Sequence, residues 1–449
     1  MDIPMDVLSS LCSEFSKYNC IDPLDYEKYH VKRGLRNEDG SGVMAGLTRI
    51  CNVHGYIIDD GERQPVDGRL FYRGIDIGDI IAGCRSDGHF GFEEVIWLLL
   101  FGYLPDRTRL EWFKNVLANS RDLPDYFAED MIIKAPSPNI MNKISRSVLA
   151  LYSYDNNPDD ISTENVLRQS ISLIAKLPTI MTYAYQVKRR YYDGESMFFH
   201  PIDTNQTIAE FVLSNIRPDR KFTELEAKVI DECLILHADH GGGNNSAFTT
   251  RVLSSSGTDT YAAISAAVGS LKGPRHGGAN IKVLEMLEML KAEIGDNWTD
   301  GEIRDYIVRL IKREAGDKSG LVYGMGHAVY TVSDPRAIIL KQRALELTQS
   351  SELYNDFKLL DAIERLMPHV LAELKGGELS ICANVDLYSG LVYRSMGISP
   401  DLFTPLFAVS RIAGWCAHRI EEITSNSRII RPAYKAVSTK QSYIPLDKR

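Results

Sequence analysis

The fold class is decided by the stretch TYAAISAAVGSLKGPRHGGANIKVLEMLEMLKAEIG (260–295), in which two helical patterns flank a turn rich in glycine. Residues 260–271 carry Ala, Ser and Gly on faces that would let neighbouring helices approach closely. Residues 281–295 have the apolar spacing of an amphipathic helix. The stretch therefore predicts two helices joined by the tight turn 272–280, which is also a candidate hinge.

Other helical patterns lie on both sides of this stretch. Apolar residues recur at helical spacing over 92–105 and 301–316, and the first of these patterns stops at Gly102 and Pro105. Three further patterns begin with an N-cap signal, either a Thr-x-x-Glu capping box or an N-cap residue followed by proline. These signals begin at Thr223, Asp334 and Ser399. The chain is therefore predicted to be mainly α-helical.

The region before residue 92 has a different pattern. Residues 52–74 alternate in polarity and contain Gly, Asp and Pro, which predicts one or two short β-hairpins near the N-terminus. No Gly/Ser-rich or Pro-rich linker divides the chain, so a second lobe would have to be inserted within the first. The turn 272–280 and the segment 390–400 are the candidate hinges between the two lobes.

The composition limits the classes of partner. The chain has 449 residues, 44% hydrophobic and 25% charged, as in a soluble globular protein. Its 51 basic and 60 acidic side chains give a formal charge of −9, which disfavours nucleic acid and anionic lipid as partners. Charged or breaking residues interrupt every apolar stretch before the ~20 residues of a membrane helix. An N-terminus without signal-peptide or transit-peptide features, and seven cysteines without CxxC spacing, predict a cytoplasmic protein with buried free thiols.

Two histidines lie in glycine-rich turns. His276 is in KGPRHGGAN (272–280) and His327 is in GMGHAVY (324–330). Glycines on both sides allow a positive φ and a close approach to a ligand. The helix after His276 begins near Asn280, and the positive end of its dipole disfavours imidazolium. His276 is therefore predicted to be a neutral donor suited to an enol or enolate oxygen, with a turn histidine bonded to backbone as the alternative.

A second pair, His237 and His240, lies at the end of the helix that begins after Thr223. Both side chains can face inward, so two satisfied core histidines are one interpretation. A metal site is another, because His237, Asp239 and His240 offer ligand atoms. The surroundings lack a matching Cys or acidic cluster, and the sequence is therefore predicted to hold no metal.

Asp386 follows the largely apolar run LSICANV (379–385). A carboxylate there loses hydration, which raises its pKa and makes it a stronger base. The alternative is a helix N-cap.

Three arginines suit a substrate with two or more carboxylates. Arg411 is the only charge between residues 402 and 417, and an unpaired buried guanidinium costs roughly several kcal/mol. It must therefore meet an internal acid or an anionic ligand. Arg336 lies in the first turn of a helix, where it can grip a carboxylate together with the helix dipole. Arg431 lies beyond the last helix, and for any one of the three a structural salt bridge is the default.

Six motifs occurring in order resemble the motif set of citrate synthases, and the resemblance runs from about residue 40 to 435. They are HADHGGGNNSAFTTR (237–251), SLKGPRHGGAN (270–280), GMGHAVYTVSDPR (324–336), NVDLYSG (384–390), FAVSRIAGW (407–415) and RIIRPAY (428–434). Earlier segments, GLTRI (46–50), LFYRG (70–74) and FEEVIWLLLFGYLP (92–105), are also similar to that family. The resemblance implies a multi-helical homodimer whose large domain (1–277 and 398–449) and inserted small domain (278–397) close over the substrates.

The resemblance also implies the activity and the role of each matching residue. The enzyme would condense acetyl-CoA with oxaloacetate in the tricarboxylic acid cycle and hydrolyse citryl-CoA to citrate and CoA. Asp386 would remove a methyl proton, His276 would donate to the thioester oxygen and His327 to the ketone of oxaloacetate. The oxaloacetate carboxylates would be held by His240, Arg336, Arg411 and the partner subunit's Arg431. No cofactor is implied, because the CoA thioester is a substrate.

One departure from the family concerns CoA. Where family members commonly carry Arg or Lys near the CoA phosphates, this chain has Thr331 and Val332. The loop that contains Leu321 and Gly324 still offers backbone groups to the adenine, and the residues that contact the phosphates stay unassigned.

Three other functions compete with citrate synthase. The nearest is 2-methylcitrate synthase, which would use propionyl-CoA with the same catalytic residues and differ by one methylene's worth of pocket, about 1–3 kcal/mol. A metal-dependent hydrolase and a non-catalytic helical dimer are more remote.

Overall fold

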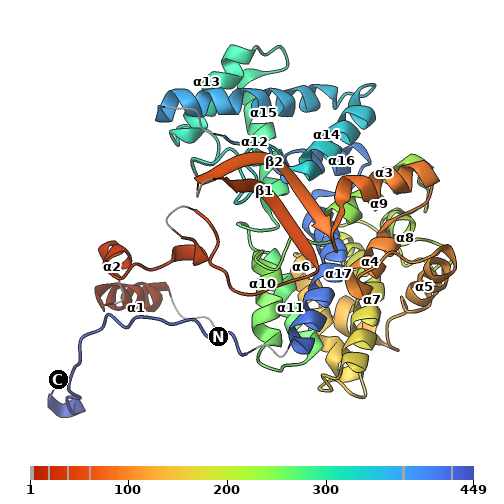
Figure 1. The fold of residues 1–449 in the computed structure, drawn as a ribbon, viewed down its shortest axis with the longest axis horizontal. Coiled ribbons are helices and arrows are strands. Elements are labelled where there is room, and N and C mark those ends of the chain that lie inside the picture. Colours follow the sequence, from red (N-terminus) through yellow and green to blue (C-terminus); the bar gives the residue numbers. More distant parts are fainter. Residues whose placement is uncertain are drawn as a thin grey trace. The chain divides into compact units, whose positions relative to one another are not determined.

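The computed structural model describes residues 5–18, 21–37, 40–59, 62–376, 380–425 and 428–448. They form two units, one of Thr48–Ile429 and one of Met1–Leu47 with Ile430–Arg449. The second unit contains α1 (Met5–Tyr18), α2 (Pro23–Lys28) and the short 3-10 helices η1 (Arg33–Leu35) and η5 (Leu446–Lys448). The larger unit holds the sheet, the remaining helices and all candidate site residues except Arg431 (Figure 1).

The strands predicted near the N-terminus form a small antiparallel sheet. β1 (Cys51–Asp59) pairs with β2 (Glu62–Tyr72), and β2 pairs with β3 (Ile75–Asp76), in the order β1-β2-β3. Cys51 lies opposite Tyr72 in the register. The predicted hairpin is therefore confirmed.

Helices make up most of the larger unit, which confirms the predicted fold class. In chain order they are α3 (Ile77–Asp87), α4 (Phe92–Phe101), α5 (Arg107–Asn119), the π-helix η2 (Ala128–Ile133), α6 (Ile140–Ala150), η3 (Leu151–Tyr154), α7 (Thr163–Tyr192), α8 (Ile208–Ile216), α9 (Glu224–His237), α10 (Asn245–Ser254), α11 (Thr260–Leu271), α12 (Ala279–Ile294), α13 (Asp300–Ile311), α14 (Pro335–Thr348), α15 (Tyr354–Lys375), α16 (Asp386–Ser395), η4 (Pro400–Leu402) and α17 (Phe403–Thr424).

The N-cap signals read from the sequence begin helices in the structure. Thr223 caps α9, and the Thr223 N–H donates to the Glu226 carboxylate (2.7 Å), which completes the capping box. At the start of α14 the Asp334 carboxylate accepts a hydrogen bond from the Arg336 N–H (3.0 Å). The helix predicted from Ser399 differs slightly, because the 3-10 turn η4 precedes α17.

Helix α13 is shorter than the helix predicted over 301–316. It ends at Ile311, and Arg313 follows with a φ of 65°. A residue at positive φ leaves the right-handed helix, while the apolar spacing of the sequence continues through the turn. Periodicity alone therefore placed this end too late.

Helix α17 forms the core of the larger unit. Residues 403–419 are buried throughout, and the helix packs against α4, α7, α9, α10 and α11 (Figure 1, α17 in blue). Polar side chains on a helix that is buried all round need internal partners or a ligand. Arg411, His418 and Arg419 are such side chains.

Helices α12 to α16 pack mainly against one another. Their contacts with the rest of the larger unit include those of α12 with α17, of α14 with α9 and β2, and of α16 with η4. The division into a large domain and a small domain over 278–397 does not coincide with the two units of the structure, and it stays a prediction. The hinges stay predictions as well.

Two expectations about composition can be compared with the described residues. Among their helices, none combines the length and the apolar character that a bilayer span requires. Five cysteines are free and buried, as predicted, whereas Cys12 is exposed, and Cys20 lies outside the described residues. The five are Cys51, Cys84, Cys233, Cys382 and Cys416.

Candidate active site

His327 and Asp386 are brought together by the pairing of two loops. The Asn384 N–H donates to the Gly324 carbonyl (2.9 Å), and its side-chain amide donates to the Gly326 carbonyl (2.9 Å). One loop therefore leads into His327 and the other into Asp386, the first residue of α16. Two loops far apart in the sequence are therefore held side by side by hydrogen bonds from the backbone and the side chain of Asn384.

The glycines before His327 have the conformation that the sequence predicts. Gly324 and Gly326 have φ angles of 82° and 89°. A Cβ atom at Gly324 would lie 2.9 Å from the Cα atom of Leu387, so the two loops could not approach as they do.

The prediction of positive φ is wrong for the turn that carries His276. None of the glycines in 272–280 has a positive φ. Glycine is needed there for space, because a Cβ atom at Gly277 would lie 2.5 Å from the carbonyl oxygen of Leu271.

The tautomer of His327 follows from its hydrogen bonds. Its Nδ1 accepts from the N–H groups of Val329 and Tyr330, both at 3.0 Å. The proton of a neutral ring therefore lies on Nε2. The ring stacks on Tyr330 (4.6 Å between centroids) and meets the edge of His240 (5.0 Å), so His327 is an oriented hydrogen-bond donor.

His276 is held through its Nε2, whereas His327 is held through its Nδ1. Its Nε2 accepts from the Ser246 N–H (3.4 Å) and lies 2.9 Å from the Ser246 hydroxyl, which also receives the Trp415 Nε1–H (3.0 Å). The proton of a neutral His276 therefore lies on Nδ1.

Burial lowers the pKa of His276 to about 4, and the positive charge of Arg411 acts in the same direction. This agrees with the neutral donor predicted from the sequence. The physical cause is different, because the prediction relied on the dipole of α12.

Asp386 is a half-buried residue whose carboxylate oxygen Oδ1 is buried. Burial raises its pKa to about 7, while the positive charges of Arg336 and Arg411 act against that rise. Its Oδ1 has no hydrogen-bond partner among the described residues. The N-cap alternative is wrong, since Val385 occupies the N-cap position and α16 has no side-chain cap.

The two predicted arginines of the larger unit differ in their partners. Arg336 is buried and binds both oxygens of Asp334 through Nε (3.0 Å) and Nη2 (2.8 Å). Arg411 donates through Nε to the His237 carbonyl (2.6 Å), and its guanidinium lies 4.7 Å from the Phe407 ring centroid. No described carboxylate forms an ion pair with Arg411, and its buried Nη2 has no partner there. Arg411 therefore keeps donor capacity for an anion.

His240 faces these groups. Burial lowers its pKa well below the usual value, and the charge of Arg336 and the neighbouring His327 act in the same direction. Within the described part of the chain its Nε2 has no hydrogen-bond partner. A neutral imidazole with an unused nitrogen is suited to a polar ligand.

His237 lies against the Phe407 ring, with 4.3 Å between the centroids. Both of its ring nitrogens are buried and have no partner among the described residues, so it is not a satisfied core histidine. His237, Asp239 and His240 do not bring ligand atoms within 4.8 Å of one another in the part of the chain that the structure describes. The geometry gives no support to a metal-dependent hydrolase on these three residues.

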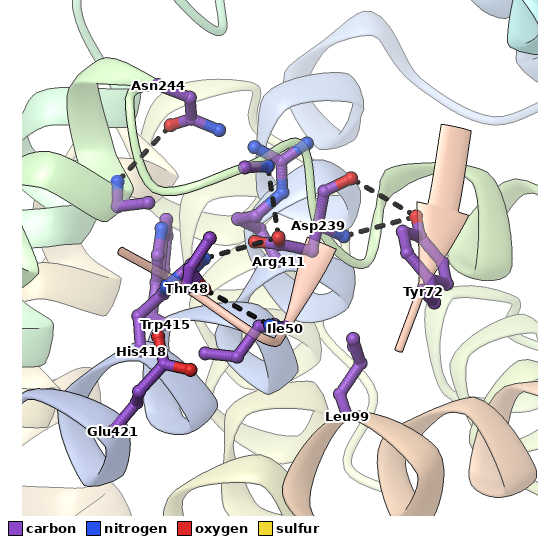
Figure 2. A network of polar contacts seen from close by, with 12 residues as sticks. Thr48, Ile50, Tyr72, Leu99, Asp239, Asn244, Arg411, Trp415, His418 and Glu421 are labelled. Carbon is purple, nitrogen blue, oxygen red and sulfur yellow. Dashed lines mark hydrogen bonds and ion pairs between the residues drawn. The ribbon is translucent and has the colours of Figure 1, made fainter. Parts of the chain in front are cut away.

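Asp239 belongs to a polar network that the sequence analysis missed (Figure 2). Its Oδ2 is hydrogen-bonded to His418 Nε2 (3.2 Å) and to the Gly241 N–H (3.0 Å). Burial alone would raise the pKa of Asp239, but the interaction with His418, the charge of Arg411 and the hydrogen bond from Gly241 lower it. The Asp239 N–H donates to the Tyr72 hydroxyl (3.2 Å), which fixes the end of α9 on β2. Arg411 and His418 are seven positions apart on α17, a spacing that puts them on one helical face and could have revealed the network.

The remaining predicted residues are Leu321, Gly324 and Arg431. Leu321 is exposed, and Gly324 is part of the loop that carries His327. Arg431 is exposed and belongs to the smaller unit, whereas the other site residues belong to the larger one. The roles assigned to all these residues stay predictions.

Residues 38–433 match the family described as "Citrate synthase, C-terminal domain". The chain belongs to the citrate synthase family. A citrate synthase of Synechocystis sp. is 34% identical over 418 residues, which covers 91% of this chain and 93% of that one. A 2-methylcitrate synthase of Shewanella oneidensis is 31% identical over 385 residues, covering 85% and 92%.

A solved citrate synthase structure has the same fold. It is the ternary complex of the Thermoplasma acidophilum enzyme with carboxymethyl coenzyme A and oxaloacetate. The TM-score is 0.75 at 25% identity, and the match covers 93% of this chain and 99% of that one. The predicted family and the mainly α-helical citrate synthase fold are therefore confirmed.

Proposed function

We propose that this chain condenses acetyl-CoA with oxaloacetate through an enol or enolate and hydrolyses the resulting citryl-CoA to citrate and CoA. The observation that carries the proposal is the Asp386 carboxylate, with a pKa raised to about 7, together with the neutral His276, the oriented donor His327 and Arg411, which has no ion pair with a described carboxylate. These are a base, two hydrogen-bond donors and an anion-binding group, which the chemistry requires together.

The proton transfer and the condensation each use a named atom of this site. The Asp386 carboxylate takes a proton from the acetyl methyl group while His276 Nδ1–H donates to the thioester oxygen. The nucleophilic carbon then attacks the ketone of oxaloacetate, and His327 Nε2–H donates to the oxygen that becomes the hydroxyl. Water finally attacks the thioester carbonyl, and the C–S bond breaks to release CoA.

Burial explains how these groups work at neutral pH. A thioester α-proton is weakly acidic, so its removal needs a base that is stronger than an exposed aspartate. The same burial keeps His276 neutral, and a neutral donor stabilises developing negative charge without losing its proton.

Oxaloacetate would be held by the unused polar groups of the site. Arg411 Nη2 and His240 Nε2 are buried and have no partner among the described residues, and a substrate carboxylate would supply one. Asp334 accepts from Nε and from one N–H of Nη2 of Arg336, so Nη1 and the second N–H of Nη2 are left for substrate. Arg336 would act partly by its charge.

The assembly and context of the enzyme are part of the proposal. We propose a homodimer in which the partner subunit's Arg431 completes the oxaloacetate site, since Arg431 is exposed in the single chain. We also propose that the enzyme works in the cytoplasm, in the tricarboxylic acid cycle and without a cofactor. Leu321 and Gly324 would offer backbone groups to the adenine of CoA.

The test is release of free thiol from a panel of acetyl-, propionyl- and butyryl-CoA with and without oxaloacetate. We expect release that depends on oxaloacetate and a higher kcat/KM for acetyl-CoA. A higher kcat/KM for propionyl-CoA would make the protein a 2-methylcitrate synthase, a function that the Shewanella oneidensis relative also suggests. Release from none of the thioesters would leave only a non-catalytic dimer.

A further inference from the structure

Three metal-ligating side chains converge at the turn between α3 and α4, outside the candidate active site. Cys84 lies in the last turn of α3, His89 in the connecting loop and Glu94 in the first turn of α4. Their ligand atoms all lie within 4.8 Å of one another. We propose that Cys84, His89 and Glu94 form a binding site for a thiophilic divalent transition-metal ion such as Zn²⁺.

The spacing of the ligand atoms is close to that of a tetrahedral site. Cys84 Sγ lies 3.9 Å and His89 Nε2 lies 3.1 Å from the same oxygen of Glu94. Zn–S and Zn–N or Zn–O bonds of about 2.3 and 2.0 Å require ligand separations of roughly 3.3 to 3.6 Å. These two separations therefore lie within a few tenths of an ångström of the required values, and the third, between the Cys84 and His89 ligand atoms, is at most 4.8 Å.

The backbone around the site is fixed by groups that are not ligands. The Asp231 carboxylate accepts hydrogen bonds from the N–H groups of Gly91 (2.7 Å) and Phe92 (3.1 Å). A Cβ atom at Gly91 would lie 2.3 Å from Cys84 Sγ, so glycine makes room for the sulfur beside the loop. The ligands are thus held in place before an ion arrives, which lowers the entropic cost of binding.

The ligand set selects the class of ion. A thiolate and an imidazole favour Zn²⁺ or Co²⁺ over Mg²⁺ and Ca²⁺, which prefer oxygen ligands alone. Three protein ligands leave a fourth position for water. His89 and Glu94 are partly exposed, with side-chain exposures of 29% and 16%, so solvent reaches the site although Cys84 is buried. On binding, the thiol proton of Cys84 would be released to solvent as the metal–sulfur bond forms.

A simpler account has no metal. His89 and Glu94 would form an ion pair, and the thiol would donate a hydrogen bond to the carboxylate. The two accounts differ in what the full-length protein does when a metal is added, because an ion pair gives no sulfur-to-metal charge transfer.

The test is titration of the full-length protein with Co²⁺ under reducing conditions, followed by competition with Zn²⁺. We expect a near-ultraviolet sulfur-to-cobalt charge-transfer band that saturates at one equivalent and disappears as Zn²⁺ displaces Co²⁺. A hundredfold excess of Zn²⁺ over its Kd should raise Tm by about 2–4 °C. Neither readout depends on enzymatic activity.

Three variants and one control decide the assignment. Cys84→Ser should abolish the band, and His89→Gln and Glu94→Gln should each weaken Co²⁺ binding by at least about tenfold. Cys12→Ser removes the exposed thiol and should change nothing. His89 is partly exposed, so its variant should keep the Tm of the metal-free protein even if Cys84→Ser folds poorly. The absence of the band in the parent protein, its persistence in Cys84→Ser or its loss in Cys12→Ser would each overturn the proposal.

Discussion

Two buried arginines of α17, Arg411 and Arg419, have opposite surroundings. The guanidinium of Arg419 donates to the Thr260 hydroxyl (2.9 Å), the Ser254 hydroxyl (3.2 Å) and the Thr258 carbonyl (2.8 Å). Arg411 donates to one carbonyl and leaves its Nη2 without a partner in the described residues. One helix therefore carries two kinds of region. In the saturated region, around Arg419, the guanidinium has hydrogen-bond partners, and in the unsaturated region, around Arg411, a buried donor has none among the described residues.

This difference between the two arginines distinguishes a region that stabilises the fold from a region that can bind substrate. An unsatisfied buried donor or acceptor costs about 1–3 kcal/mol, so a fold does not keep several of them together without a reason. Asp386, His237 and His240 also have buried polar atoms without partners, as Arg411 does. The unsaturated region is where a polyanionic substrate would restore the missing partners, and the saturated region holds the helices together.

The largest expected effect is that of Asp386→Asn, which removes the base of the unsaturated region. We expect kcat to fall by at least about 10³-fold, since general-base catalysis contributes about 10²–10⁴-fold. In the parent protein, the pKa of about 7 should give kcat/KM for acetyl-CoA an acid limb near that pH. Thiol release measured between pH 5 and pH 9 tests both, and normal release by Asp386→Asn would remove the role of Asp386.

The same variant has a stability signature with a defined sign. Because the folded pKa of Asp386 lies above its unfolded value, the folded protein binds the extra proton between about pH 4 and pH 7. The cost of burying the carboxylate is therefore complete above pH 7 and disappears as the pH falls to 4. Asp386→Asn should be more stable than the parent at pH 8, by a few kcal/mol in order of magnitude, and equal to it near pH 4. Denaturant titrations at both pH values measure this difference.

The matched pair Arg411→Leu and Arg419→Leu tests the comparison directly. Arg411→Leu should lower kcat/KM for oxaloacetate by about 10²-fold, because a buried charge-assisted contact contributes about 2–5 kcal/mol, and should change the unfolding free energy by less than about 1 kcal/mol. Arg419→Leu leaves three buried partners unsatisfied and should cost about 2–4 kcal/mol of stability while the folded protein keeps its KM. If both variants lost only stability, the unsaturated region would be structural too.

Much of the fold was predictable because its signals are local. The capping box at Thr223 and the Asp-Pro start of α14 satisfy their own backbone groups, so the sequence reveals them without tertiary information. The end of α13 depends on one residue, Arg313, at positive φ, which periodicity cannot show. Helix starts with side-chain caps were therefore predicted better than helix ends.

The identity of the site residues could be predicted from the sequence better than the physical causes of their properties. All the predicted site residues except Arg431 belong to one unit, but the neutrality of His276 comes from burial and Arg411, which only the folded structure supplies. The spacing of Arg411 and His418 indicates a polar face on α17, but the hydrogen bond between Asp239 and His418 joins residues 179 positions apart, so the sequence does not identify the partner. Long-range polar contacts were the part that sequence reasoning could not reach.

A smaller effect is expected where backbone conformation shapes the unsaturated region. Gly324→Ala would place a Cβ atom 2.9 Å from the Cα atom of Leu387, at a φ of 82°. It should cost about 1–3 kcal/mol and lower kcat by roughly tenfold, because the paired loops position His327 and Asp386. Gly397→Ala is the control, since Gly397 also has a positive φ (69°) but open space around it. Equal losses of kcat in the two variants would show that strain alone is responsible.

The smallest effect is expected for Trp415→Phe, which removes the Nε1–H donor to the Ser246 hydroxyl. Ser246 orients His276, so the variant should lower kcat a few fold and leave KM for oxaloacetate unchanged. Trp97→Phe removes the same group from a buried indole whose Nε1 has no partner among the described residues, so it controls for lost volume. Both variants should lose about 1–2 kcal/mol of stability, and only Trp415→Phe should lose activity. A similar kcat in both would mean that the chain from Trp415 through Ser246 to His276 fills space on α17 and does not position the donor.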